Sequence, residues 1–232
     1  MLSDLQIERY SRQIILPQVG GKGQERLLHA SVLVSGDSPL QTQALLYLTA
    51  AGVGRIGVCG TEPLPLLAAL VPEHQASAVT ALRQLNPDCV IVVYDRQDQQ
   101  AVMRLVQQYD LVIAEPNAQL HAACYATQRP FLCGQVSATT AWLAVYRGYE
   151  DNLPCFACET WPRSETVPSL GVDDEPVGPF IGTVLATEAI KCVLGLNPMN
   201  TTKLLQCNFP ALSFHERVLA KNPHCSVCRR SS

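Results

Sequence analysis

The stretch that decides the fold is Val32-Leu33-Val34-Ser35-Gly36-Asp37-Ser38-Pro39-Leu40-Gln41, which runs from an apolar segment through a turn into a helix that ends at Gly52. The apolar run is continuous, as in a strand that is buried on both faces of a parallel sheet. A turn of this kind binds phosphate when several glycines let backbone N–H groups approach the anion. This turn has one glycine, an acid and a proline, so the sequence predicts an altered anion site.

Short strands and helices alternate on both sides of this turn. We expect strands over residues 31–35, 55–59, 89–94, 110–114 and 130–133, with a helix in each connection. Such alternation predicts an α/β fold with a doubly wound, mostly parallel, Rossmann-like sheet. From residue 135 the sequence becomes rich in β-formers, which predicts antiparallel strands, and a helix is expected over 180–194.

We therefore expect one domain, 1–232, in three parts. These are an N-terminal helical arm (1–30), a Rossmann-like core (31–134) and a C-terminal part (135–232) that contains a crossover loop at about 151–179.

The composition indicates a globular cytoplasmic protein. Apolar residues make up 47% of the chain, charged residues 16%, and the net charge is −3 without blocks of like charge, so neither a nucleic acid nor a membrane surface is expected as a partner. The N-terminus lacks the pattern of a secretory signal. Six of the ten cysteines stand singly in apolar segments, which is typical of reduced thiols. Cys59 and Cys133 end strands, where a nucleophile could lie, although lone thiols there are more often core residues.

The other four cysteines form two Cys-x-x-Cys pairs, Cys155/Cys158 and Cys225/Cys228. Two such pairs complete a tetrahedral zinc shell, and four protein ligands leave no coordination position for a substrate. The sequence therefore predicts a structural zinc site that joins the tail to the start of the crossover loop. The alternatives are a redox pair or four unrelated thiols.

Several ordered segments resemble the ThiF/MoeB/HesA family, the bacterial relatives of ubiquitin-activating enzymes. They are residues 7–17 (IERYSRQIILP), 44–57 (ALLYLTAAGVGRIG), 85–88 (LNPD), 176–182 (PVGPFIG) and 188–191 (EAIK), and the two cysteine pairs match the family's zinc site. Members of this family are usually dimers that bind MgATP and adenylate the C-terminal glycine of a small ubiquitin-like or sulfur-carrier protein.

Carried over position by position, the resemblance implies an eroded nucleotide pocket. The ribose-binding aspartate falls on Gly60, the phosphate-binding lysine on His74 and the magnesium-binding aspartate on Asn117, while the thiol that some members use falls on Leu170. Losing a lysine and a metal-binding carboxylate removes the charges that phosphoryl chemistry depends on. We therefore expect poor binding of ATP and magnesium. The vestigial pocket consists of Gly36, Asp37, Ser38, Gly60, Glu62, His74 and Asn117.

The turn and the N-terminal motif add two more expectations. Ser38 to Gln41 has the spacing of a capping box with proline at the first helical position, so the helix start would satisfy its own N–H groups. In the family, the arginine at Arg12 reaches across the dimer into the partner's ATP site, where an arginine finger acts through its charge. The alternative is a surface arginine paired with an acid.

Three functions remain open on the sequence alone. The first is a non-adenylating pseudoenzyme that serves as a subunit or docking platform in a ubiquitin-like or sulfur-carrier system, as a homodimer or with an active ThiF/MoeB-like subunit. The second is an active ATP-dependent adenylyltransferase of such a carrier. The third is a dinucleotide-dependent oxidoreductase, which the loss of the pyrophosphate fingerprint disfavours.

Overall fold

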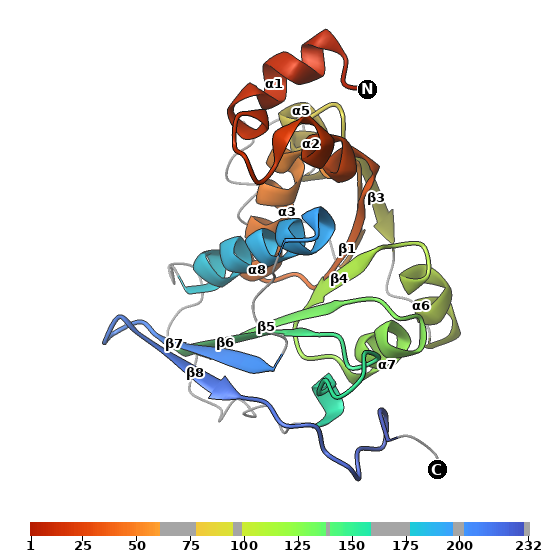
Figure 1. Cartoon of the computed structure of the whole chain (residues 1–232), viewed down its shortest axis with the longest axis vertical. Helices are drawn as coiled ribbons and strands as arrows, with labels where there is room; N and C mark the ends of the chain where they lie inside the picture. The colour runs from red at the N-terminus through yellow and green to blue at the C-terminus, as the bar shows by residue number, and fades with distance from the viewer. Residues whose placement is uncertain (61–77, 95–98, 138–139, 159–176, 197–201, 230–232) are drawn as a thin grey trace.

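The computed structural model describes residues 1–60, 78–94, 99–137, 140–158, 177–196 and 202–229. Their strands form one eight-stranded sheet in the order β3-β2-β1-β4-β5-β6-β7-β8 (Figure 1). The parallel strands are β1 (Ser31–Ser35), β2 (Arg55–Cys59), β3 (Val90–Tyr94), β4 (Leu111–Ala114) and β5 (Phe131–Ser137). The antiparallel strands are β6 (Thr140–Tyr146), β7 (Lys203–Asn208) and β8 (Ser213–Val218). The predicted fold class is confirmed.

Helices cover both faces of the sheet, as the continuous apolar run of β1 predicts. Val32 and Val34 contribute to one core with α2, α3, α5 and α8, whereas Leu33 points to the opposite core with α6 and α7. Figure 1 shows α3 and α8 side by side on their face and α6 and α7 together on the other. The helices are α1 (Asp4–Ile14), α2 (Gly20–His29), α3 (Pro39–Ala51), α5 (Ala78–Leu85), α6 (Gln99–Val106), α7 (Ala118–Ala126) and α8 (Val177–Leu194), with a 3-10 turn η1 (Phe156–Cys158).

Helix α8 is long and apolar enough to cross a membrane by length and composition, yet half of it is buried inside the protein. It crosses α3 so closely that a Cβ at Gly182 would overlap the carbonyl oxygen of Leu40. Its two charged side chains, Glu188 and Lys191, pair at 2.7 Å. The helix is thus part of the core of this fold.

Two elements differ from the sequence-based expectation. The sequence places the Gly-rich segment at residues 20–23 before a short helix that ends at His29, but in the structure this segment is the first turn of α2. Gly23 packs against Leu194 of α8, and this tertiary contact outweighs the low helix propensity of glycine. Strand β5 continues to Ser137, because its second half pairs with β6 in antiparallel register.

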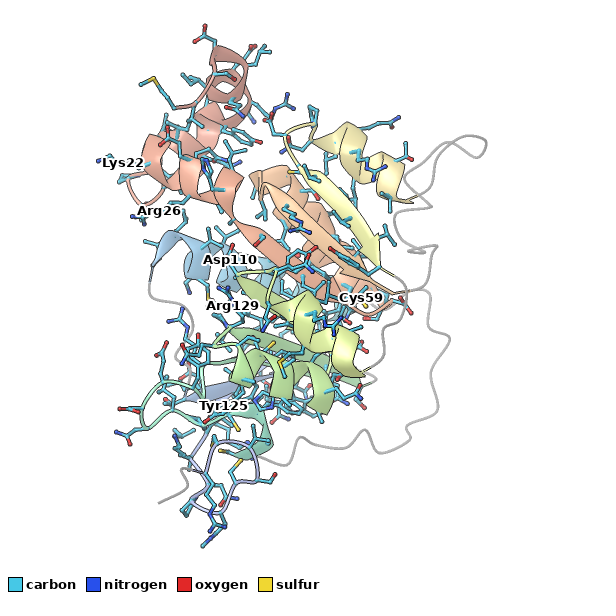
Figure 2. All side chains as sticks on the ribbon, turned by 90° about the vertical axis from the view of Figure 1, so that its right-hand side faces the viewer. Lys22, Arg26, Cys59, Asp110, Tyr125 and Arg129 are labelled. Carbon is cyan, nitrogen blue, oxygen red and sulfur yellow. The ribbon has the colours of Figure 1, made fainter. Side chains whose placement is uncertain are left out.

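The strand order reverses between β1 and β4, so the carboxyl edge of these strands is the topological switch point where open α/β sheets bind ligands. Figure 2 labels Cys59 at this edge. It also labels Asp110 and Arg129, which precede β4 and β5 at the opposite edge and form an ion pair of 3.8 Å.

Candidate functional site

A cavity of about 380 Å³ opens at the carboxyl edge, between the turn after β1, the end of β2 and the connection from β4 to α7. Gly36, Asp37, Gly60 and Asn117, all expected at a vestigial nucleotide pocket, line it. The sequence-based expectation did not include Glu115, which lines it too and follows β4 directly. Ser38 stands beside the cavity as the N-cap of α3. Glu62, His74 and Leu170 lie outside the described residues.

Gln41 closes the turn after β1. Its side-chain oxygen accepts hydrogen bonds from the backbone N–H and the hydroxyl of Ser38, and its amide nitrogen donates to the carbonyl of Ser35 at 3.3 Å. The predicted capping box is therefore present. A Cβ at Gly36 would lie 2.5 Å from the Gln41 amide nitrogen. The Gln41 side chain therefore packs directly against Gly36 inside the turn.

Asp37 lies across the end of β2. A Cβ added at Gly60 would overlap Oδ1 of Asp37, so the carboxylate rests directly on the Gly60 backbone. Gly60 is not among the glycines with positive φ, so its backbone conformation does not require glycine. The close approach of Asp37 does, because a side chain at residue 60 would overlap it. The Gly36 N–H also donates to the Cys59 carbonyl at 3.0 Å, which ties the turn to β2.

The charges around the cavity are negative. Asp37 and Glu115 contribute carboxylates, and none of the described residues that line it is a lysine, arginine or histidine. Asn117, at the expected magnesium position, is the N-cap of α7, and its side-chain oxygen accepts the Leu120 N–H at 2.9 Å. That oxygen stabilises the start of α7.

The two strand-end thiols have different surroundings. Cys59 is half-buried and lines the cavity. Cys133 is fully buried, and desolvation, followed by the charge of Glu115, raises the pKa of its thiol well above the usual range. Cys133 is therefore a core thiol, as its apolar strand predicts.

The N-terminal motif packs on the Asn-Pro-Asp segment at the end of α5. Arg9 pairs with Asp88 at 3.2 Å, and the Tyr10 hydroxyl accepts from the Asn86 amide at 3.0 Å. Tyr10 fits against Gly52, where a Cβ would lie 2.6 Å from its hydroxyl oxygen. These residues hold α1 on the fold and leave the exposed Arg12 side chain on its outer surface.

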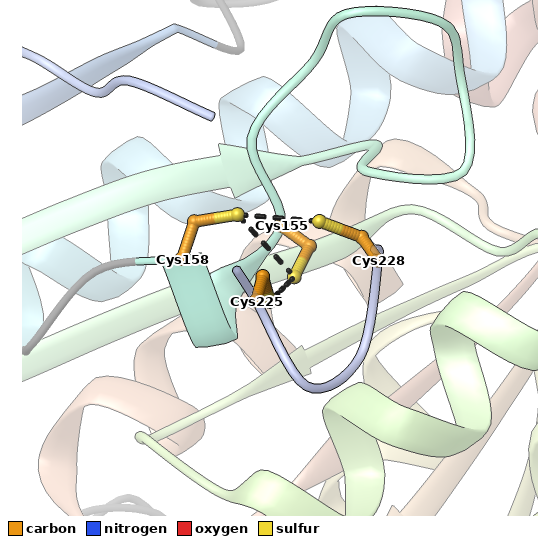
Figure 3. A group of neighbouring side chains, drawn as sticks. All are labelled: Cys155, Cys158, Cys225 and Cys228. Carbon is orange, nitrogen blue, oxygen red and sulfur yellow. Dashed lines mark hydrogen bonds between the residues drawn. The ribbon is translucent and has the colours of Figure 1, made fainter. Parts of the chain in front are cut away.

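The four paired cysteines converge between η1 and the segment after β8 (Figure 3). Their sulfurs lie within 4.8 Å of one another, with separations of 3.6 Å for Cys155/Cys225, 3.8 Å for Cys155/Cys158 and 3.3 Å for Cys158/Cys228. A tetrahedral zinc ion with bonds of about 2.3 Å places its sulfurs about 3.8 Å apart. The arrangement of the donor atoms fits such an ion.

The acidity of Cys225 suits a metal ligand. Burial by itself raises the pKa of its thiol, but hydrogen bonds from the Cys228 and Val227 backbone and from neighbouring thiols outweigh burial and lower the pKa to about 7. Burial raises the pKa of Cys228 to about 11 and that of Cys155 further. A cation at the centre would favour the thiolate form of all four.

His121 supports the first cysteine pair from α7. Its Nε2 accepts the backbone N–H of Phe156 at 3.2 Å, and its ring packs against Phe131, Tyr146 and Phe156. Burial lowers the pKa of His121 to about 4, so the ring is neutral at physiological pH.

Comparison with known proteins identifies relatives over nearly the whole chain. The chain is 31% identical over 250 residues to the sulfur carrier protein adenylyltransferase of Thermus thermophilus, covering 96% of this chain and 91% of that protein. It is 32% identical over 249 residues to the adenylyltransferase and sulfurtransferase MOCS3 of Drosophila ananassae, covering 98% of this chain but 54% of that protein. The chain thus spans about half the length of the MOCS3 relatives.

Solved structures share the fold at lower identity. PaaA superposes with a TM-score of 0.78 at 16% identity, covering 95% of this chain and 76% of that one. E. coli MccB, in a structure with ATP, superposes with a TM-score of 0.76 at 17% identity, covering 96% of this chain and 75% of that one.

The family comparison agrees with the resemblance in the motifs. The model of the ThiF family matches residues 73–227, which include three of the four paired cysteines, Cys155, Cys158 and Cys225, and the whole of α8. Together with the relatives above, this match shows that the chain belongs to the ThiF family.

Proposed function

We propose that this chain is an adenylyltransferase that activates the C-terminal glycine of a small sulfur-carrier or ubiquitin-like protein. The observation that carries the proposal is the identity of 31% to a sulfur carrier protein adenylyltransferase over 91% of that protein's length. In this reaction a carboxylate oxygen of the carrier attacks the α-phosphorus of ATP. The bond from that phosphorus to the bridging oxygen breaks, and pyrophosphate leaves as the acyl-adenylate forms.

The cavity at the carboxyl edge is the proposed place of reaction. It lies at the switch point of the sheet, and its volume of about 380 Å³ is in the range of small-molecule sites. The missing lysine and magnesium carboxylate predict a slow enzyme, because these charges normally stabilise the transition state.

We propose that Cys155, Cys158, Cys225 and Cys228 hold a structural zinc ion. The support is the mutual distance of their sulfurs, which lie within 4.8 Å of one another. Bound there, zinc would supply a cross-link, because four thiolates leave no position for a substrate. Reduced thiols also suit the cytoplasmic location that we propose.

We further propose that the chain works as a dimer, either with itself or with an active subunit of the same family. Arg12 is exposed near the end of α1, and the nearby side chains of Ile15 and Leu16 are exposed and apolar. A partner surface would cover these apolar groups and bring Arg12 within reach of the partner's nucleotide.

A second candidate function has its own support. Gln41 fills the space above Gly36, and carboxylates of Asp37 and Glu115 line the cavity. Both features oppose a bound triphosphate, as expected of a non-adenylating subunit or docking platform. The relatives described above carry no oxidoreductase name, so the dinucleotide hypothesis gains nothing from them.

Exchange of labelled pyrophosphate into ATP separates the two candidates. The assay contains the purified chain, MgATP and a small carrier that ends in Gly-Gly, and the control carrier lacks its last glycine. An adenylyltransferase gives exchange only with the intact carrier. Without exchange, the adenylyltransferase proposal fails.

The non-adenylating candidate has a separate test. The chain is mixed with an active relative, and the relative's exchange rate is compared with wild-type chain and with Arg12→Ala. A docking or arginine-donating subunit changes the rate only when assembled, and Arg12→Ala reverses the change. An unchanged rate in an assembled complex contradicts this second candidate.

A further inference from the structure

Asp37 and Gly60 form one structural unit at the carboxyl edge of the sheet, although they belong to different strand ends. The Asp37 carboxylate rests on Gly60 at the place where a side chain of residue 60 would begin. The Gly36 N–H holds the turn against β2 through the Cys59 carbonyl at 3.0 Å. The turn that carries Asp37 is therefore joined to the end of β2, next to Gly60.

In Rossmann-type sheets, an acid at the end of the second strand binds the ribose hydroxyls of the nucleotide. Residue 60 occupies this strand end and has no side chain, but the Asp37 carboxylate lies immediately above it. We propose that Asp37 supplies, from the turn after β1, the carboxylate that binds the cis-diol of a ribonucleoside in this cavity. Gly60 provides the space for it.

An apolar part of the cavity lining suits the base of such a ligand. Val102 and Leu105 of α6 and Leu120 of α7 line it with apolar side chains that are at least 91% buried. Apolar side chains and a carboxylate that line the same cavity match the two parts of a nucleoside, a flat base and a sugar with two hydroxyl donors. Neither contact involves the Gln41 side chain, which packs over Gly36.

This proposal rests on the proposed adenylyltransferase function, because that function makes adenosine the expected nucleoside. It makes Asp37 a specificity-determining residue of this chain. A ribose acid from the β1 turn also explains how residue 60 can be glycine in a nucleotide-binding cavity.

The test uses adenosine, 2′-deoxyadenosine and 3′-deoxyadenosine, because these probes carry no phosphate. Their affinities for the purified full chain are measured by ligand-observed NMR titration. We expect adenosine to bind tenfold to a hundredfold more tightly than either deoxynucleoside, which is the size of a hydrogen bond to a charged acceptor. Asp37→Asn is expected to reduce this ratio to about threefold or less, because the acceptor loses its charge.

Two further variants make the test specific. Glu115→Gln removes the same charge from the same cavity without touching Gly60, and it is expected to keep the adenosine preference. The double variant Asp37→Gly/Gly60→Asp returns the acid to the end of β2 and is expected to restore the preference. A restored preference shows that a carboxylate at this place provides the preference, and thermal melting of each variant checks that it is folded.

The inference is overturned if the chain binds adenosine and both deoxynucleosides equally, if Asp37→Asn keeps the preference, or if no nucleoside binds at all. The proposed function is judged separately by pyrophosphate exchange. A preference that depends on Asp37 without exchange supports this inference and removes the proposed function. If pyrophosphate exchange occurs but Asp37→Asn keeps the preference for adenosine, the proposed function is supported and this inference fails.

Discussion

The Tyr10 hydroxyl donates a hydrogen bond of 3.0 Å to the carboxylate of Asp88, which connects the N-terminal helix to the end of α5. Tyr10 is 1% exposed, and the same hydroxyl accepts from Asn86, whose amide also donates to the Thr49 carbonyl at 2.8 Å. Two segments that the sequence presents as separate motifs are therefore one buried polar network.

Tyr10→Phe should destabilise the protein by about 1–3 kcal/mol, because Asp88 and Asn86 each lose a partner in a buried setting. The free energy of unfolding is measured by urea denaturation. Tyr47→Phe is the matched control, since Tyr47 is 46% exposed, and it should change the free energy by less than about 0.5 kcal/mol. Equal effects of the two substitutions would show that the network contributes nothing.

Cys225→Ala should abolish metal binding, because three sulfurs cannot complete a closed tetrahedral shell. The purified protein is expected to contain one zinc ion per chain by elemental analysis, and the variant close to none. Cys207→Ala removes a buried thiol of β7, outside the cluster, and should keep the full metal content. A metal-free wild-type protein after purification without chelators would contradict the zinc proposal.

His121 should make the protein less stable in acid. Its pKa in the folded state is about 4, below the value of 6.5 for a free histidine, because burial disfavours the charged ring. The unfolded chain then binds more protons between these values. The stabilising contribution is complete above about pH 6.5 and is lost as the pH falls toward 4, by at most about 1.4 kcal/mol per pH unit.

The measurement compares unfolding of wild type and His121→Phe from pH 7 to pH 5. The substitution removes the Phe156 hydrogen bond at every pH, so the informative quantity is the slope, which should be shallower in the variant. Titration of the cysteines affects both proteins and cancels in the difference. Identical slopes would mean that His121 is protonated in the folded protein at its ordinary pKa.

Gln41→Gly should strengthen the binding of pyrophosphate and ATP, because it uncovers Gly36 and frees N–H groups at the start of α3. A gain of about tenfold is the size of a hydrogen bond to a charged group, and losing the cap should cost about 1 kcal/mol of stability. Gln43→Gly has the same effect on helix propensity two residues further along and should give no gain. Calorimetric titration measures both variants, and a gain of equal size in both would exclude this role of Gln41.

The parallel core and the cysteine cluster were predictable from sequence because both depend on local patterns. Strand β1 carries a continuous apolar run, and the paired cysteines have a spacing that few other structures explain. The start of α2 was not predictable, since the helical state of residues 20–23 depends on the contact of Gly23 with Leu194. The length of β5 likewise depends on its antiparallel neighbour.

The chemistry of the cavity was predictable only in part. Comparison of positions assigned Gly60 and Asn117 to a nucleotide pocket, and both line the cavity at the edge of the sheet; the capping box of Gln41 followed from its spacing. The placement of the Asp37 carboxylate over Gly60 depends on how two strand ends meet, which no local pattern records. Glu115 belongs to no recognisable motif either, and it lines the cavity because it directly follows β4.

The cysteine cluster joins residues that are 70 positions apart, so a metal ion bound there would close a very long loop. By the loop-entropy argument used for disulfides, such a closure lowers the entropy of the unfolded chain and so destabilises it by on the order of 4 kcal/mol. Oxidation within each Cys-x-x-Cys pair would replace that long-range link by two short rings with little entropic effect. Oxidant stress and metal starvation should therefore loosen the same end of the molecule.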